Sequence, residues 1–117
     1  MNKEKAKELP IPKTVPSSDA RLHLLYMDLC GPMRVESING KKYILVIVDD
    51  YSRYTWVKFL RSKDEAPSTI ITFLKRIQVL LQAPVRIVRT DNGTEFTNQE
   101  LRTYFEDVGI THQTSVV

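Results

Sequence analysis

The sequence YILVIVDDYSRYTWVKFL, residues 43–60, carries the strongest structural signal in this chain. Its first six residues, Tyr43 to Val48, are apolar and rich in β-branched side chains, a pattern typical of an interior strand covered on both faces. Asp49 to Arg53 reverse the chain, and Tyr54 to Leu60 read as a further strand. The stretch therefore predicts two antiparallel strands joined by a short turn.

The segment before this stretch predicts a third strand. Residues 22–29 (LHLLYMDL) alternate between two faces, and Asp28 shares its face with Leu24 and Tyr26. Gly31-Pro32 should bend the strand, and Asn39-Gly40 is a strong signal for a type I′ hairpin. Residues 22–60 are thus expected to form an antiparallel meander.

After residue 60 the spacing of the apolar residues changes from that of a strand to that of a helix. Apolar residues between Ile70 and Leu81 recur at helical spacing. The helix would begin with a capping box at Ser62 and Glu65, or with Asp64 as the cap and Pro67 in the first turn. Pro84 should end it.

The last third of the chain repeats the pattern of strand then helix. Val85 to Thr90 predict a fourth strand, followed by the turn Asp91-Asn92-Gly93. A second capping box at Thr97 and Glu100 would open a helix that ends at Gly109, and Ile110 to Ser115 would begin a fifth strand. Strands connected through helices should be parallel. The fold class is therefore α/β: a mixed five-stranded sheet with strand one central, strand four parallel beside it, and helices packed on its faces.

Composition limits the class of protein. The 117 residues predict one domain, and 42% hydrophobic with 26% charged residues exclude a disordered chain. Residues 1–21 hold three prolines and a net charge of +2, so we expect an extended basic tail before a domain at 22–117. Of the total charge of +3, the rest contributes only +1, so charge permits a nucleic-acid partner without requiring one. The single cysteine, the short apolar runs and the lack of a signal peptide favour an intracellular protein outside the membrane.

Two acidic residues stand out. Asp28 interrupts an apolar strand, where a carboxylate is costly unless it is solvated, paired or bound to a metal. Asp91 follows the fourth strand, although Asp-Asn-Gly is also ordinary turn chemistry. The inferred sheet places both near the same edge. Two adjacent carboxylates repel unless a cation lies between them, and Mg²⁺ or Mn²⁺ suits such oxygen ligands. Metal-assisted phosphoryl transfer uses sites of this kind.

Several segments also carry a resemblance to a known family. MDLCGP, NGKKYILVIVDDYSRYTWVKFLRSKDEAP, RTDNGTEF and GITHQTS occur in this order between residues 27 and 115. Together they closely resemble the integrase catalytic core of copia-type LTR retrotransposons, within the retroviral integrase and ribonuclease H-like group. The resemblance implies the ribonuclease H-like fold and a polynucleotidyl transferase acting on DNA, both element ends and target. It also implies that Asp28 and Asp91 are the first two members of an Asp, Asp, Glu triad that holds two metal ions.

The sequence departs from the family in three places. The third carboxylate of the family lies roughly 35 residues after the second, and only 26 residues follow Asp91, so the core is expected to be C-terminally truncated and inactive by itself. His23, Cys30 and His112 cannot supply the spacing of the family's N-terminal zinc module. Tyr26 stands where relatives often carry His.

Other acids could substitute for the missing carboxylate. If Asn39-Gly40 sets the register, Asp28 lies opposite roughly residue 51, so Asp49 or Asp50 could approach it; the alternative is that both are solvated at a strand end. Glu95 is expected to favour the start of the second helix through the helix dipole.

The remaining candidates have plainer interpretations. Cys30 is expected to be a small buried hydrophobe, and His112 to be structural. The aromatic residues Tyr51, Tyr54 and Trp56 could stack on bases or belong to the core. Scattered bases could contact phosphate or form a solvated surface: Lys41, Lys42, Lys58, Arg61, Lys75, Arg76, Arg86 and Arg89.

The sequence therefore predicts an integrase-type core that binds DNA, without a small-molecule cofactor, in the nucleus if it functions. The alternative is a non-catalytic remnant of a retroelement that binds nucleic acid or self-associates as a homo-oligomer. Missing C-terminal helices would expose apolar sheet surface, so we also expect a marginally stable fold.

Overall fold

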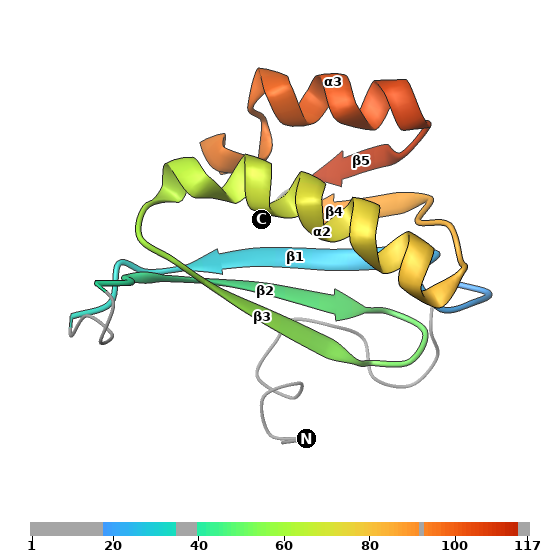
Figure 1. Cartoon of the computed structure of the whole chain (residues 1–117), viewed down its shortest axis with the longest axis horizontal. Helices are drawn as coiled ribbons and strands as arrows, with labels where there is room; N and C mark the ends of the chain where they lie inside the picture. The colour runs from blue at the N-terminus through green and yellow to red at the C-terminus, as the bar shows by residue number, and fades with distance from the viewer. Residues whose placement is uncertain (1–17, 35–39, 92, 115–117) are drawn as a thin grey trace.

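The computed structural model describes residues 18–34, 40–91 and 93–114. They form a five-stranded sheet of order β3-β2-β1-β4-β5, with two helices (Figure 1). The strands are β1 (Leu24–Cys30), β2 (Tyr43–Asp49), β3 (Thr55–Leu60), β4 (Ile87–Thr90) and β5 (Thr111–Thr114). The helices are α2 (Ala66–Leu81) and α3 (Gln99–Val108), preceded by the 3-10 turns η1 (Lys63–Glu65) and η2 (Thr94–Phe96).

Strand β1 lies at the centre of the sheet, as predicted. It pairs antiparallel with β2 and parallel with β4, and the next pairs outward are β2 with β3, antiparallel, and β4 with β5, parallel. The predicted mixed α/β sheet is therefore confirmed. The strand bounds move by one or two residues at most ends. The fourth strand begins at Ile87 instead of Val85, because the backbone N–H of Val85 donates to the side chain of Gln78 at 2.9 Å.

The predicted register between the first two strands is wrong. Asp28 lies opposite Val46, and the β1–β2 pairing ends with Cys30 opposite Ile44. Beyond it the backbone turns out of the ladder at Gly31, whose φ of 135° a residue with a side chain rarely adopts. Residues 31–42 separate the two strands, and the turn expected at Asn39-Gly40 includes Asn39, which lies outside the described residues.

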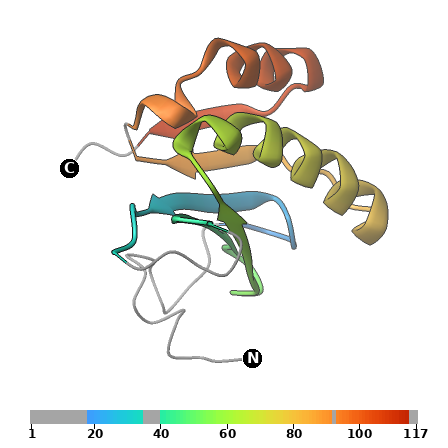
Figure 2. The same ribbon diagram turned by 60° about the vertical axis from the view of Figure 1, so that its left-hand side comes forward.

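Both helices cover the same face of the sheet (Figure 2), whereas the sequence led us to expect helices on both faces. The connections β3 to β4 and β4 to β5 advance in the same direction across the sheet, so two right-handed crossovers place α2 and α3 on one side. The main core lies between the helices and this face, with Leu25, Ile47, Ile70, Leu74 and Phe105 among its buried members.

The helix starts differ from both predicted capping boxes. Asn98 caps α3, its Oδ1 accepting from the backbone N–H of Leu101 at 3.2 Å, in place of Thr97. Neither Ser62 nor Asp64 caps α2, since that helix begins after Glu65, whose carboxylate accepts from the N–H of Arg61. Gly109 ends α3 with a φ of 79°, as predicted. In the described part of the chain no helix is long and apolar enough to cross a membrane.

Candidate functional site

The candidate site lies where β1 passes the end of β4. The last pair in their parallel ladder is Tyr26 with Arg89. Asp28 and Asp91 each lie two residues further along the same direction. Because side chains in a strand alternate between faces with a period of two, Asp28 lies on the same face as Tyr26. Asp91 directly follows the last residue of β4, and its charge acts on Asp28. The fold thus brings the two predicted residues close together where neighbouring parallel strands pass.

The two carboxylates influence one another electrostatically. Burial raises the pKa of half-buried Asp28, and the charge of Asp91 raises it further, against a hydrogen bond from the backbone at Leu29 that lowers it. Asp91 is exposed, and its Oδ1 accepts from the N–H of Gly93 at 2.9 Å, so it also has the turn role considered from sequence. Within residues 18–34, 40–91 and 93–114, no lysine or arginine forms an ion pair with either aspartate.

Glu95 adds a third negative charge. It lies in η2, ahead of α3, whose first turn holds Glu100 instead. The Glu95 carboxylate covers Gly93 so closely that a Cβ at that glycine would overlap it. Its charge also raises the pKa of Asp28. From the sequence, Glu95 is one of the acids that could substitute for the missing carboxylate, although a role at the helix start is the favoured interpretation. Its spacing of four residues after Asp91 was the signal for its place near the pair.

The donor chemistry of this pair fits a hard divalent cation. Carboxylate oxygens are the ligands that Mg²⁺ and Mn²⁺ prefer, and a cation would relieve the repulsion that raises the pKa of Asp28. The number of donors is smaller than a complete site needs. Among the residues that the structure describes, no group of three or more His, Cys, Asp or Glu side chains is placed to hold a metal ion.

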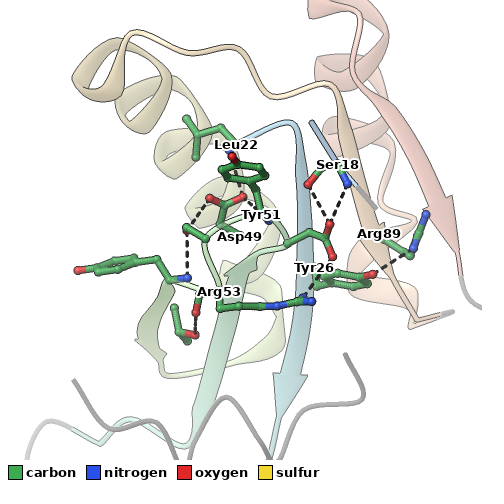
Figure 3. A network of polar contacts seen from close by, with 11 residues as sticks. Ser18, Leu22, Tyr26, Asp49, Tyr51, Arg53 and Arg89 are labelled. Carbon is green, nitrogen blue, oxygen red and sulfur yellow. Dashed lines mark hydrogen bonds and ion pairs between the residues drawn. The ribbon is translucent and has the colours of Figure 1, made fainter. Parts of the chain in front are cut away.

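A polar network crosses three strands directly beside the aspartates. Arg89 donates from Nη1 to the hydroxyl of Tyr26 at 3.2 Å (Figure 3). It also donates from Nε and Nη2 to Oε1 of Gln113, at 3.0 and 2.7 Å. The guanidinium also lies 5.4 Å from the centre of the Tyr26 ring. Tyr26, which departs from the family pattern, therefore has a polar contact that holds β1 to β4. From the sequence, Arg89 is one of several scattered bases that could contact phosphate or form a solvated surface.

A second chain of contacts leads from β5 to Asp91. The Thr90 hydroxyl donates to the backbone oxygen of Asp91 at 2.8 Å, so its oxygen is left to accept from Nε2 of His112, 2.7 Å away. Burial lowers the pKa of His112, which favours the neutral ring. The structural role predicted for His112 agrees with these contacts.

Asp49 and Asp50 do not approach Asp28. Both are fully buried, so the alternative of solvated strand-end carboxylates is wrong as well. Asp49 accepts from the N–H of Leu22 and from the Ser52 hydroxyl at 2.7 Å, while Asp50 accepts from Ser18 and from Arg53 at 3.3 Å (Figure 3). These carboxylates fasten the segment before β1 to the turn between β2 and β3.

The other sequence candidates divide between surface and core. Cys30 is exposed, which corrects the prediction of a buried thiol. The pKa of its thiol is raised, first by partial desolvation and then by the charge of Asp28. Trp56 is half-buried against Phe73, with ring centres 5.2 Å apart, whereas Tyr51 and Tyr54 are about half exposed.

The comparisons with known proteins agree with one another on the family of this chain. The integrase core domain family matches residues 19–117. The chain is 36% identical over 103 residues, 86% of its length, to the retrovirus-related Pol polyprotein from transposon TNT 1-94 of Nicotiana tabacum. It is 31% identical over 111 residues, 95% of its length, to that from transposon RE2 of Arabidopsis thaliana. It is 30% identical over 89 residues, 74% of its length, to the transposon Ty1-DR4 Gag-Pol polyprotein of Saccharomyces cerevisiae. These matches cover 8%, 7% and 6% of the three polyproteins.

Proposed function

This chain belongs to the integrase core domain family, with its ribonuclease H-like fold, and from that premise we propose that Asp28 and Asp91 hold a divalent cation for phosphodiester transfer on DNA. The observation that carries the proposal is that each carboxylate lies two residues beyond the Tyr26–Arg89 pair of neighbouring parallel strands, close enough for the charge of Asp91 to act on Asp28. The raised pKa of Asp28 supports it, because a bound cation would offset the charge of Asp91.

The chain's own residues supply the position and the electrostatic field of the site. Asp28 is held by a central strand paired on both sides, and Asp91 by the turn that its carboxylate forms with Gly93. Mg²⁺ or Mn²⁺ bound there would activate water or a DNA 3′-hydroxyl for in-line attack and would stabilise the leaving oxygen. Arg89 joins β4 to β1 through Tyr26 and to β5 through Gln113, which helps to hold the two aspartates in place.

The third carboxylate of the family is expected roughly 35 residues after Asp91, a position beyond residue 117. A polypeptide of residues 1–117 by itself is therefore proposed to bind metal weakly and to transfer DNA strands poorly. Glu95, whose charge already reaches Asp28, is the described residue best placed to contribute to the cation's field.

The proposal is tested by metal binding, which does not require activity. We expect calorimetry with Mn²⁺ to show binding with a dissociation constant of roughly millimolar size, as for sites with few charged ligands. Asp28→Asn and Asp91→Asn should each abolish it, because a lone carboxylate binds poorly. Asp107→Asn, at an exposed position on α3, is the matched control. Binding that survives both site variants, or that Asp107→Asn removes equally, contradicts the proposal.

A non-catalytic nucleic-acid-binding or self-associating remnant is the second candidate. The observation that favours it is that the described residues hold no group of three metal-ligating side chains. It predicts DNA binding that weakens with salt but is indifferent to Mn²⁺ and to Asp28→Asn. For the first candidate, element ends and target DNA are the proposed substrates, a homo-oligomer the proposed assembly and the nucleus the proposed location.

A further inference from the structure

A hollow between β3 and α2 lies apart from the aspartates. Its volume is about 440 Å³, a size that accommodates a small ligand or a few side chains of a peptide. It is lined chiefly by Trp56 and Lys58 of β3 and by Thr72, Phe73, Arg76 and Leu80 of α2.

The spacing of these residues explains the hollow. Trp56 and Lys58 are two residues apart on a strand and so share a face, and Thr72, Arg76 and Leu80 recur every four residues along one stripe of α2. The floor is aromatic, because the rings of Trp56 and Phe73 meet edge to face with centres 5.2 Å apart.

The charge of the hollow is positive. The Nζ atom of Lys58 lies 5.7 Å from the centre of the Phe73 ring, and Arg76 is exposed on the helix side. No acidic residue lines the hollow, and in the part of the chain that the structure describes neither cation forms an ion pair. Leu80, 74% exposed, adds an apolar rim. Two cations beside an aromatic floor complement a ligand that is acidic and partly apolar.

The neighbouring strand edge favours a peptide as that ligand. Strand β3 is the outermost strand on its side of the described sheet (Figure 1), and an edge strand can pair with an extended peptide. A hollow of about 440 Å³ accommodates a few side chains of a peptide rather than a DNA duplex. The chain's residues 1–17 are a poor match, since they carry four lysines against two glutamates.

We propose that this hollow is a docking site for an extended acidic peptide of a partner protein, with glutamate or aspartate side chains facing Lys58 and Arg76 and an apolar side chain on the Trp56–Phe73 floor. The site is separate from the aspartate pair and does not depend on the function proposed for that pair.

The single tryptophan of the chain makes the test direct, because its fluorescence reports on this hollow alone. We expect a synthetic hexapeptide of alternating glutamate and leucine to change the Trp56 emission saturably, and a lysine–leucine hexapeptide to leave it unchanged. Lys58→Glu and Arg76→Glu should each weaken binding about tenfold, because each replaces an attraction with a repulsion. Lys75→Glu is the matched control, since Lys75 lies on the same helix over Tyr104 and does not line the hollow.

Several results would overturn the proposal, provided circular dichroism shows that each variant is folded. Equal binding of both peptides, or equal loss in Lys75→Glu and Arg76→Glu, would mean that no specific site exists. Displacement of the glutamate peptide by duplex DNA in all variants alike would indicate a nucleic-acid surface. A concentration-dependent change in Trp56 emission without peptide, lost in Arg76→Glu, would indicate a second copy of this chain as the occupant.

Discussion

At the scale of single residues, the most unusual feature is a carboxylate within the central strand. Asp28 has a raised pKa because burial and the charge of Asp91 both penalise its ionised form. The folded state therefore binds the proton more tightly than the unfolded chain does. The stability that this group contributes is full below the pKa that an aspartate has in the unfolded chain, and it is lost as the pH rises through the higher pKa of the folded state.

Because the raised pKa of Asp28 means that its ionised form is destabilising, we expect Asp28→Asn to raise the free energy of unfolding at pH 7 in the absence of divalent metal. The gain should vanish near pH 3, where Asp28 is protonated. Urea unfolding at the two pH values measures the difference, with Asp107→Asn as the control. A variant that is less stable than the parent at pH 7 would contradict this account.

Asp49 shows the opposite use of a carboxylate. It is 1% exposed and accepts hydrogen bonds from the backbone of Leu22 and Tyr51 and from the Ser52 hydroxyl. Here the acid is structural, because it satisfies donors that would otherwise be buried without partners.

We expect Asp49→Ala to lower the free energy of unfolding by about 2–4 kcal/mol, since it leaves buried donors without an acceptor. Asp49→Asn keeps one acceptor oxygen and should cost less. Chemical unfolding measures both, and Asp107→Ala, on the surface of α3, should change stability by less than about 0.5 kcal/mol. Equal stability of Asp49→Ala and the parent would refute the structural role.

At the scale of elements, the start of α3 shows how a neighbouring turn can override a capping signal in the sequence. The predicted capping box starts the helix at Thr97 with Glu100, whereas the observed cap is Asn98, one residue later. The structure uses Asn98, because η2 ends at Phe96 and leaves Thr97 bonded back to the oxygen of Thr94 at 3.2 Å. The short turn therefore decides which residue caps the helix.

Accordingly, Asn98→Ala should destabilise the protein by about 1 kcal/mol through loss of the bond to Leu101, and Asn98→Ser should restore most of it. Thr97→Ala is the informative comparison, because the predicted capping box would make it the more damaging change. Thermal unfolding of the three variants ranks them, and a larger loss in Thr97→Ala than in Asn98→Ala would reverse our assignment.

At the scale of the whole molecule, the sheet has two unlike faces. One face is covered by α2 and α3, while the opposite face carries Asp28 and the Tyr26–Arg89–Gln113 network. Phe59, on the edge strand β3, is 53% exposed. Among the described residues, the polar network and the exposed ring of Phe59 thus lie on the sheet away from the helices.

The kinds of element, their order and the mixed sheet could be predicted from the sequence. Apolar side chains recur every two residues in strands and about every 3.6 residues in helices, and this spacing does not depend on how the strands pair. The closeness of Asp28 and Asp91 was also predictable, since parallel strands connected through a helix place their corresponding ends together.

The prediction failed for contacts that depend on loop length. The place of Asp28 opposite Val46 depends on where the chain leaves the ladder at Gly31, and the burial of Asp49 and Asp50 depends on their contacts with the segment before β1. The side of the sheet that both helices cover, the Arg89 network and the cationic hollow beside Trp56 depend on long-range packing, so only the tertiary structure decided them.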